Sequence, residues 1–377
     1  AIGIGEIAND AVTADKLANS VNASIAAKLP LVGGTMTGDL TVTNATATGV
    51  LSDPSGNVRA GRKNWIINGD FQISQRGAYS SATSITSSSV YYLDRFKSKH
   101  NNISGTTVRQ TNQTVNGKVT NTMMLTATAG SNGRVEAVQI IEDQVFNSQT
   151  VTVSAWVISN SASARLVIHQ SGANIQTSSN AHTGGGAYEL LKATVTCASN
   201  AGQLHIYTGI QAAATGNVAI ANGHYFKMAF LQLELGSVAT DFEHLSYAEQ
   251  LRLCYRYFYK PVYGNEPYAR FNFHYEPSAW IGLEINFPVT MRANATFSHS
   301  LTNAKNKGAS PTSSEDKWCY YIQNTGFRGN AGGGDISNLS GGGVTHGQCG
   351  VASHSPNAHA SHIFIGGGCT FQFDAEL

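Results

Sequence analysis

Aromatic side chains set among small polar residues are the groups in this chain best suited to chemistry, and that chemistry is sugar binding. An aromatic face stacks on the apolar face of a pyranose, while Asn, Asp, Gln and Arg satisfy its hydroxyls. The candidates in the first half of the chain are Tyr91, Tyr92 and Trp156, and those in the second half are Tyr263, Tyr268, Tyr275 and Trp280. Large aromatics also fill β-sandwich cores, so each candidate has a structural alternative. Tyr263 and Tyr268 lie among Pro, Gly and Asn and are predicted to be exposed.

Four histidines near the end of the chain form a second group of candidates. His346, His354, His359 and His362 lie in the glycine-rich stretch 326–368. In a trimer each would be present three times, which could supply an octahedral metal site. Their spacings of 8, 5 and 3 residues match no compact ligand motif. We therefore interpret them as polar loop residues, either contacting a receptor at the tip of the molecule or belonging to a tightly packed end.

Catalytic motifs give little support for an enzyme. The sequence has no P-loop, no Gly-x-Ser-x-Gly and no His-Glu-x-x-His. Adjacent acids such as Glu142 and Asp143 point apart on a strand, whereas glycoside hydrolysis needs two carboxylates about 5 to 10 Å apart across a cleft. Such a pair could still come from separate strands. We expect no enzyme activity and no catalytic residue.

The composition favours a β-rich protein that is shielded by neighbouring copies of itself. Charged residues are 12% of the chain, about half the usual share, and the surface must be covered by Ser, Thr, Asn, Gln and the 39 Gly. The net charge of +1 argues against a nucleic-acid partner, and no apolar window is long enough to insert into a membrane. The five cysteines are odd in number and scattered, which predicts free thiols made in a reducing cytoplasm.

Residues 1–60 read as a trimeric shaft. Thr13 can cap a helix whose apolar stripe is Leu17, Val21 and Ile25, and a short strand at 39–43 leaves Leu40 and Val42 without a partner sheet. A stripe this short is not stable alone, so we expect a parallel homotrimer. A surface helix packed on its own domain is the alternative. The chain begins at Ala1 without Met, so we also expect a fragment or processed form of a longer protein.

Two further regions follow, and both are mainly β. Residues 61–245 contain alternating runs at 122–128, 151–157, 165–169, 189–196, 203–208 and 225–235, which predict an antiparallel β-sandwich of the jelly-roll kind. Ser246 and Glu249 form a capping box for a short linking helix with an apolar face at Leu251, Cys254, Tyr255 and Phe258. Residues 246–377 then continue as a C-terminal β tip domain with alternation at 269–275, 280–287 and 295–300 and glycine-rich loops.

Several segments resemble bacteriophage tail proteins. The stretch Leu31-Val-Gly-Gly-Thr-Met-Thr-Gly-Asp39 resembles a motif of tail fibres and tail spikes, in which three chains wrap around one axis. Asn64-Trp-Ile-Ile-Asn-Gly-Asp-Phe71, Tyr91-Tyr-Leu-Asp-Arg-Phe96 and Leu231-Gln-Leu-Glu-Leu-Gly236 through Thr240-Asp-Phe-Glu243 resemble the opening and close of the carbohydrate-binding-module-like jelly roll found in such proteins. The resemblance fades beyond residue 300.

This resemblance implies a function, partners and a metal. It implies a phage tail fibre or receptor-binding protein of the virion, assembled in the host cytoplasm and joined to other tail proteins at its N-terminal end. It implies non-covalent, multivalent adhesion to a host surface glycan, lipopolysaccharide or capsule, with no cofactor required. A structural calcium is also implied as an option, with Asn68, Asp70 and Glu234 as oxygen ligands. The alternatives are a tail-associated polysaccharide depolymerase and a structural virion connector.

Overall fold

The computed structural model describes residues 62–85, 89–142, 146–261, 268–271, 273–276, 280–299, 303–304, 317–322, 326–328, 346–352, 360–366 and 370–376. The chain divides into two units, residues 1–58 and 59–377, and every described residue belongs to the second. The predicted shaft residues lie outside the described part of the chain: Leu17, Val21, Ile25, Leu40 and Val42.

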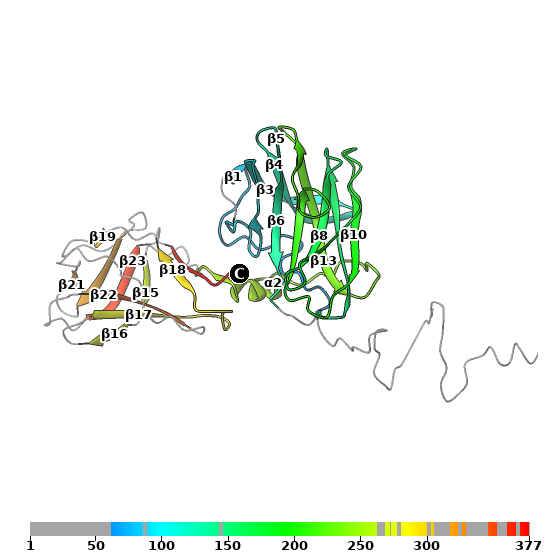
Figure 1. The fold of residues 1–377 in the computed structure, drawn as a ribbon. Helices are drawn as coiled ribbons and strands as arrows, with labels where there is room; N and C mark the ends of the chain where they lie inside the picture. Colours follow the sequence, from blue (N-terminus) through cyan, green and yellow to red (C-terminus); the bar gives the residue numbers. More distant parts are fainter. Residues whose placement is uncertain are drawn as a thin grey trace, which may run out of the picture. The chain divides into compact units, whose positions relative to one another are not determined.

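The protein is mainly β, as predicted, and its largest body is a sandwich of two antiparallel sheets (Figure 1). The six-stranded sheet has the order β1(Thr83–Ile85)-β3(Gly105–Val115)-β4(Lys118–Ala127)-β13(Tyr225–Leu235)-β7(Thr150–Ser159)-β10(Glu189–Thr196). The five-stranded sheet has the order β2(Lys97–Ser98)-β6(Val135–Ile140)-β11(Leu204–Ile210)-β8(Ala164–Gln170)-β9(Ile175–Ser178). β5(Ser131–Gly133) and β12(Val218–Ile220) pair with each other as a separate two-stranded ribbon.

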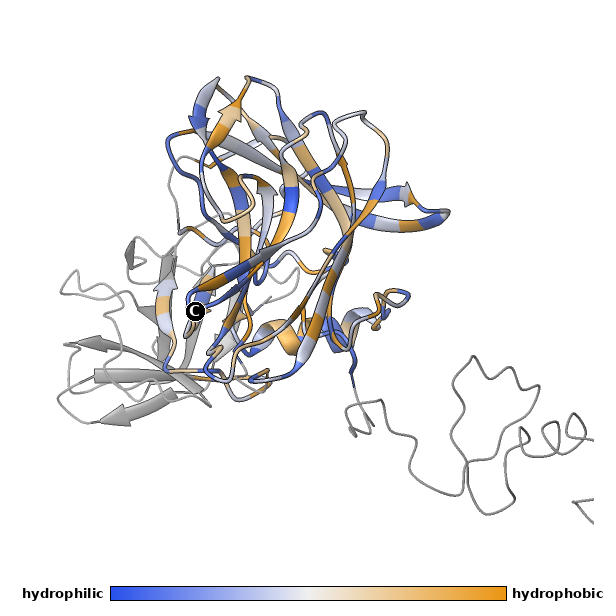
Figure 2. Ribbon diagram, turned by 45° about the vertical axis from the view of Figure 1, so that its right-hand side comes forward, coloured by the Kyte–Doolittle hydropathy of each residue, from blue (hydrophilic) through white to orange (hydrophobic). Residues whose placement is uncertain are grey.

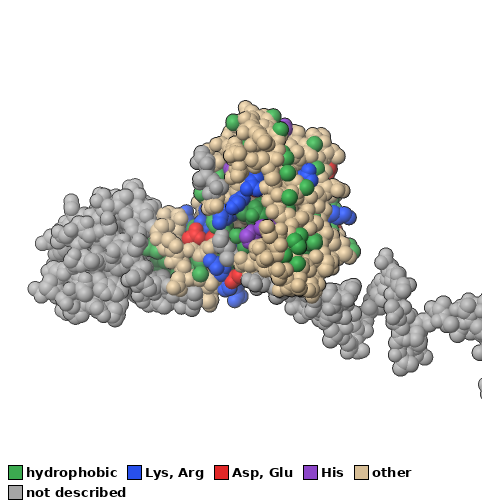
Figure 3. All heavy atoms as spheres, in the orientation of Figure 1, with side chains coloured by type: hydrophobic (Ala, Val, Ile, Leu, Met, Phe, Trp, Pro, Cys, Tyr) green, Lys and Arg blue, Asp and Glu red, His purple; other side chains and the backbone are tan. Residues whose placement is uncertain are grey.

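Alternating side chains build the core between the two sheets. On β7 the buried Val151, Val153 and Val157 face inward, and on β8 Leu166 and Ile168 meet them from the other sheet in one hydrophobic cluster. Polar and apolar residues alternate from Thr150 to Ser154 of β7, whereas Leu166, Val167 and Ile168 of β8 are apolar in succession. Hydrophobic and hydrophilic residues are interspersed along the strands of the sandwich (Figure 2). Charged side chains are sparse on the visible surface of the sandwich, in keeping with the composition (Figure 3).

The opening and closing motifs of the sandwich are joined to each other by hydrogen bonds. The Asn64 amide oxygen accepts from the backbone N–H of Leu233 at 3.0 Å, and its amide nitrogen donates to the Leu231 carbonyl at 3.1 Å. The Glu243 carboxylate accepts from the N–H groups of Lys63 and Asn64 at 2.9 and 2.6 Å. These hydrogen bonds join residues near the two ends of the sandwich sequence, so the two motifs form one structural unit.

The linking helix α2(Tyr247–Tyr255) has the predicted capping box. The Ser246 hydroxyl accepts from the Glu249 N–H, and the Glu249 side chain accepts from the Ser246 N–H at 2.9 Å. Cys254 is buried on its inner face. Phe258, which the sequence placed on the same helical stripe, lies instead in β14(Phe258–Tyr259), because the helix ends at Tyr255.

The last described residues of the chain form ion pairs with two arginines of the sandwich, Arg76 and Arg95. β24(Phe371–Asp374) pairs with β14 and with β18(Thr296–His299). After β24, the Glu376 carboxylate forms an ion pair with Arg95, and both side chains are almost fully buried. The Arg95 guanidinium also donates to the Ile140 carbonyl at 2.6 Å and stacks 3.5 Å from the Tyr257 ring centroid. Arg76 adds an ion pair to Asp374 at 2.7 Å.

The remaining strands belong to the C-terminal β region. β15(Tyr268–Phe271) pairs with β23(Ala360–Gly366), which pairs with β20(Lys317–Ile322); β20 in turn pairs with β19(Asn303–Ala304) and β21(Gly326–Arg328). A separate sheet has the order β16(Phe273–Glu276)-β17(Trp280–Asn286)-β22(His346–Ala352). The sequence predicted one strand over 269–275, whereas the structure divides it between two sheets.

Among the described residues, no helix is both long enough and apolar enough to span a bilayer.

The two described cysteine side chains are buried free thiols. Cys197 and Cys254 form no disulfide, and burial raises the pKa of both thiols. The side chains of Cys319, Cys349 and Cys369 lie outside the described part of the chain. We expect a thiol titration without reductant to find all five cysteines reactive in denatured protein, with Cys254 unreactive until unfolding. Two missing thiols in the denatured sample would instead reveal a disulfide.

Candidate functional site

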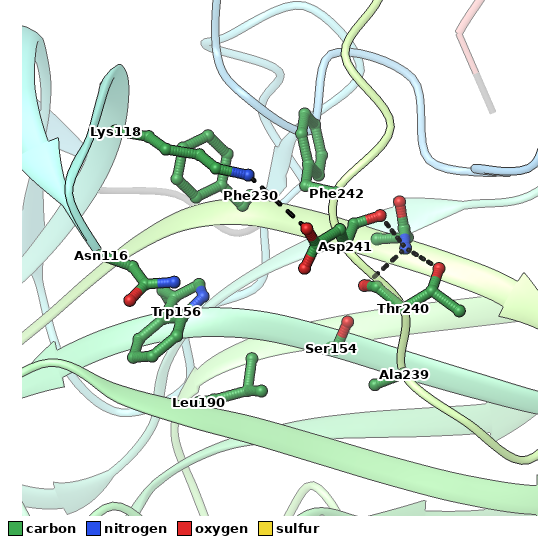
Figure 4. A pocket seen from close by; sticks show the side chains of 11 residues that line it. Asn116, Lys118, Ser154, Trp156, Leu190, Phe230, Ala239, Thr240, Asp241 and Phe242 are labelled. Carbon is green, nitrogen blue, oxygen red and sulfur yellow. Dashed lines mark hydrogen bonds and ion pairs between the residues drawn. The ribbon is translucent and has the colours of Figure 1, made fainter. Parts of the chain in front are cut away.

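A groove lies on the outer face of the six-stranded sheet, the face turned away from the core. Its cavity volume is about 110 Å³, so a ligand would lie across it rather than be enclosed. We call it the sheet groove, and its lining residues, drawn in Figure 4, are Asn116, Lys118, Ser154, Trp156, Leu190, Phe230, Gln232, Ala239, Thr240, Asp241 and Phe242.

Trp156 belongs to the groove floor and not to the core. The core residues of β7 are Val151, Val153, Ala155 and Val157, so strict alternation places Trp156 on the opposite face, where it is half-buried. Its neighbour in register on β10 is Leu190, whose side chain is 45% exposed. Of the two orientations that the sequence left open for Trp156, the structure shows the outward one.

A β-bulge adds a second aromatic ring to the floor. In β13, Phe226 and Met228 face the core, and the register with β7 shifts between Ala229 and Gln232. The extra residue turns Phe230 outward and returns Leu231 to the core, with Phe230 at a φ of 55°.

The backbone of the opening motif closes over this bulge. The Gly69 carbonyl accepts from the Leu231 N–H at 2.9 Å, and a Cβ at Gly69 would lie 2.1 Å from the Leu231 carbonyl oxygen. Only glycine fits at this position. The opening motif therefore supports the strand segment that places Phe230 in the groove.

The chain after β13 forms one wall of the groove. Glu234 accepts from the Thr240 N–H at 2.8 Å and from its hydroxyl at 2.7 Å, while the fully buried Gln232 accepts from the Glu243 N–H at 2.9 Å. These bonds hold Phe242 against the floor, with ring centroids 5.1 Å from Phe230. The wall is thus positioned by side chains of the closing motif.

The β3–β4 hairpin forms the facing wall. Its two turn residues, Asn116 and Gly117, have positive φ angles of 47° and 73°, the conformation that an Asn-Gly hairpin turn adopts. Val115 packs on Phe230 from this hairpin. Lys118 reaches across to Asp241, with its Nζ 3.9 Å from the carboxylate, and both side chains are largely exposed (Figure 4).

The groove therefore combines flat apolar surface with exposed polar groups at its rim. Trp156 and Phe242 offer ring surface above the buried Phe230, and Asn116, Lys118 and Asp241 offer donors and acceptors. Asp241 is the single carboxylate among the residues that line the groove, so the lining does not provide the paired acids of a glycosidase.

The other two aromatic candidates in the sandwich have structural roles. Tyr92 is 3% exposed in the core, and its hydroxyl donates to the Met123 sulfur at 3.5 Å. Tyr91 is half-buried and lies 5.3 Å from the Arg76 guanidinium and 5.5 Å from the Lys97 ammonium. Burial raises the pKa of both phenols. Neither residue lines the sheet groove.

The candidates in the second half of the chain lie outside the part whose side chains the structure describes. Tyr268 falls in β15, His346 in β22 and His362 in β23, but only their backbone is described. Tyr263, His354 and His359 are not described at all. Their role in a tip receptor site stays a prediction.

The three calcium candidates do not form a set of free oxygen ligands. The Asn68 amide oxygen accepts from the Ile73 N–H at 2.9 Å, and both Glu234 oxygens accept from Thr240. Asp70 keeps one buried oxygen without a partner among the described residues, and burial raises the pKa of this carboxyl. One available oxygen is far fewer than the about six to eight that calcium takes, so these side chains do not fit the ion.

No protein-family model matches the chain, and no curated protein matches it either. Among solved structures, it is similar to tailspike protein 4 of bacteriophage CBA120, with 11% identity, 46% of this chain covered and a TM-score of 0.32. The chain covers about a fifth (21%) of that tailspike chain.

Two carbohydrate-binding modules are also similar. The family 11 module of a cellulosomal cellulase of Clostridium thermocellum has 11% identity, a TM-score of 0.28, and coverage of 43% of this chain and 99% of its own. The CBM22-1 xylan-binding domain of a Paenibacillus barcinonensis protein has 13% identity, a TM-score of 0.26, and coverage of 44% and 94%.

Proposed function

We propose that the chain binds glycans through the sheet groove. The observation that carries this proposal is the groove floor, in which the half-buried Trp156 lies beside the buried Phe230 ring, walled by Phe242 and bordered by Asn116, Lys118 and Asp241. Stacking on flat rings and hydrogen bonding at the rim are what a pyranose requires. Its volume of about 110 Å³ can hold part of a sugar unit, as suits a chain-like ligand that runs along the surface.

The biological setting that we propose is a phage tail fibre adhering to a host surface glycan. Support comes from the resemblance of the 31–39 segment and of the two sandwich motifs to tail-fibre proteins. In a homotrimer three weak grooves would engage one repetitive surface, and such linkage can raise the effective affinity by ~10² or more. Recognition by the C-terminal tip loops would add to this adhesion.

We propose that the chain binds glycans without cleaving them. Purified protein should bind oligosaccharides of a host polysaccharide in isothermal titration calorimetry and release no reducing ends from the polymer. Release of reducing sugar would favour the depolymerase alternative. Failure to bind any saccharide of a broad glycan array would favour the structural connector.

The proposed trimer gives a prediction about assembly. Light scattering at micromolar concentration should give about three times the chain mass of 39.9 kDa. Replacing Leu40 and Val42 with Asp should weaken the trimer, because each buried apolar side chain contributes ~1.5 to 3 kcal/mol and counts three times per trimer. A monomer mass for the unaltered chain would contradict the proposal.

A further inference from the structure

The floor of the sheet groove has a polar row of side chains beside its apolar one. The apolar row holds Trp156 of β7 and its register partner Leu190 of β10. Two residues further along the same strands, Ser154 of β7 is in register with Lys192 of β10 on one side and with Gln232 of β13 on the other. At about 3.3 Å per residue, the two rows lie about 7 Å apart, which is close to the width of one sugar unit.

Lys192 lies on the groove side of β10. Its sequence neighbours Leu191 and Ala193 belong to the core, so alternation places Lys192 on the outer face together with Leu190. Lys192 is exposed, and it forms no ion pair with a described carboxylate. Its ammonium is therefore available to a ligand that lies over Ser154.

Ser154 contributes a second donor to the polar row. Its side chain lines the groove, and only 4% of the residue is exposed. Figure 4 shows its hydroxyl directed into the groove, where it forms no hydrogen bond with another described residue. Because a nearly buried hydroxyl without a partner costs free energy, this group gains from donating to a ligand.

The carboxylates nearest to the polar row are already engaged. Both oxygens of the nearly buried Glu234 accept from Thr240, at 2.8 and 2.7 Å. Asp241 lines the groove from the wall after β13, and the Lys118 ammonium lies 3.9 Å from its carboxylate. Neither acid forms an ion pair with Lys192.

Two donors without a local acceptor favour a ligand group that only accepts. An ionised carboxylate accepts at both of its oxygens, and an ammonium makes a charge-assisted hydrogen bond to it. A pyranose ring that stacks on Trp156 carries its ring substituents outward over the neighbouring row. A carboxylate on that ring then lies over Ser154, within reach of the long, flexible Lys192 side chain.

We propose that Ser154 and Lys192 form a subsite of the sheet groove for the carboxylate of a hexuronic acid. The sugar ring stacks on Trp156, and its carboxylate accepts from the Ser154 hydroxyl and the Lys192 ammonium. This preference rests on the proposed function of the groove, because it names the class of sugar that the groove favours. Neutral sugars bind through stacking and the rim groups, with lower affinity.

Calorimetry on the full chain with two matched pairs of oligosaccharides tests the subsite. The pairs are tetragalacturonic acid with its carboxyl-reduced form, and β-1,4-linked tetraglucuronic acid with cellotetraose. At least one uronate should bind about fivefold more tightly than its neutral counterpart, the effect of one partly exposed charged contact. High salt should reduce this preference, because it screens exposed charges.

Substitutions assign the preference to the polar row. Lys192→Gln should remove it and leave the affinity for the neutral counterpart unchanged, whereas Lys192→Arg should retain it. Ser154→Ala should reduce it in part, since one of the two donors is lost. Lys99→Gln makes the same change of net charge next to β2, in the other sheet, and should leave the preference intact.

The outcomes separate this subsite from the proposed function. Equal affinity for each uronate and its neutral counterpart would overturn the subsite and leave glycan binding by the groove in place. A preference that survives Lys192→Gln would also overturn it. If none of the four oligosaccharides binds, the subsite is again overturned, and a further failure on a broad glycan array would contradict the proposed function itself.

Discussion

Glu376→Gln should destabilise the sandwich strongly, by about 3 to 5 kcal/mol. The substitution leaves the Arg95 guanidinium, which is 1% exposed, without its charge partner, and breaking a buried pair on one side costs this much because an uncompensated charge stays buried. Arg95 cannot turn to water, since it also donates to the Ile140 carbonyl and stacks on Tyr257. Urea unfolding followed by tryptophan fluorescence would measure the change through Trp65 and Trp156.

A double-mutant cycle supplies the control. Arg95→Met alone should also be costly, because it leaves the buried Glu376 carboxylate with only its longer ion pair to Arg76, at 3.5 Å. The two changes together should cost clearly less than the sum of the single costs, since no buried charge then remains. Asp374→Asn is the matched single change. The Asp374 side chain is 37% exposed, and its partner Arg76 keeps a second ion pair to Glu376 at 3.5 Å, so we expect a smaller cost. Equal costs for Glu376→Gln and Asp374→Asn would contradict the argument.

The strands of the sandwich were predictable because one of their faces is buried. The predicted runs at 189–196 and 225–235 coincide with β10 and β13, and the run at 151–157 lies within β7. The capping box at Ser246 could also be predicted, because it depends only on residues that are close together in the sequence. The contact between the chain end and the sandwich could not be predicted from the sequence, because the Arg95–Glu376 pair joins residues far apart in the chain.

The groove could be predicted only in part. Trp156 was a candidate from its residue type, yet its outward direction depends on which β7 face meets the other sheet. Phe230 was missed because a one-residue bulge changes its side of the sheet, and the alternating pattern of β13 does not show where that bulge falls. The Asn116-Gly117 dipeptide is typical of a hairpin turn. It would have predicted that Lys118 lies at the end of a hairpin, which here borders the groove.

The closing motif has a physical explanation in the structure. Gln232, Glu234 and Glu243 resemble a family pattern in sequence, and in the fold their side chains hold residues 240–243 against the sheet and against Asn64. The motif thus fixes the wall that carries Phe242 and Asp241. We therefore expect substitutions at the exposed tip of that wall to leave the sandwich folded.

Trp156→Ala should reduce the affinity for a neutral host oligosaccharide by about 30-fold or more, and this is the largest binding effect that we expect. A central aromatic anchor in an interface contributes about 2 kcal/mol or more, and 1.4 kcal/mol is a factor of ten in affinity. Trp156 is such an anchor, because it lies in the floor between Leu190 and Phe230. Calorimetric titration of the variant beside the unaltered protein would measure the loss.

Two further variants make that result specific. Trp156→Phe should recover a large part of the affinity, because a flat ring remains for stacking. Tyr247→Ala removes an aromatic side chain that is more exposed than Trp156, 58% exposed on α2 and outside the groove lining, and should leave the affinity unchanged. Thermal unfolding of each variant would show that the fold is retained, since Trp156 is only half-buried. Full binding by Trp156→Ala with an intact fold would exclude the sheet groove, and the receptor site would then have to lie in the C-terminal region, with Tyr263 and Tyr268 as the residues to change next.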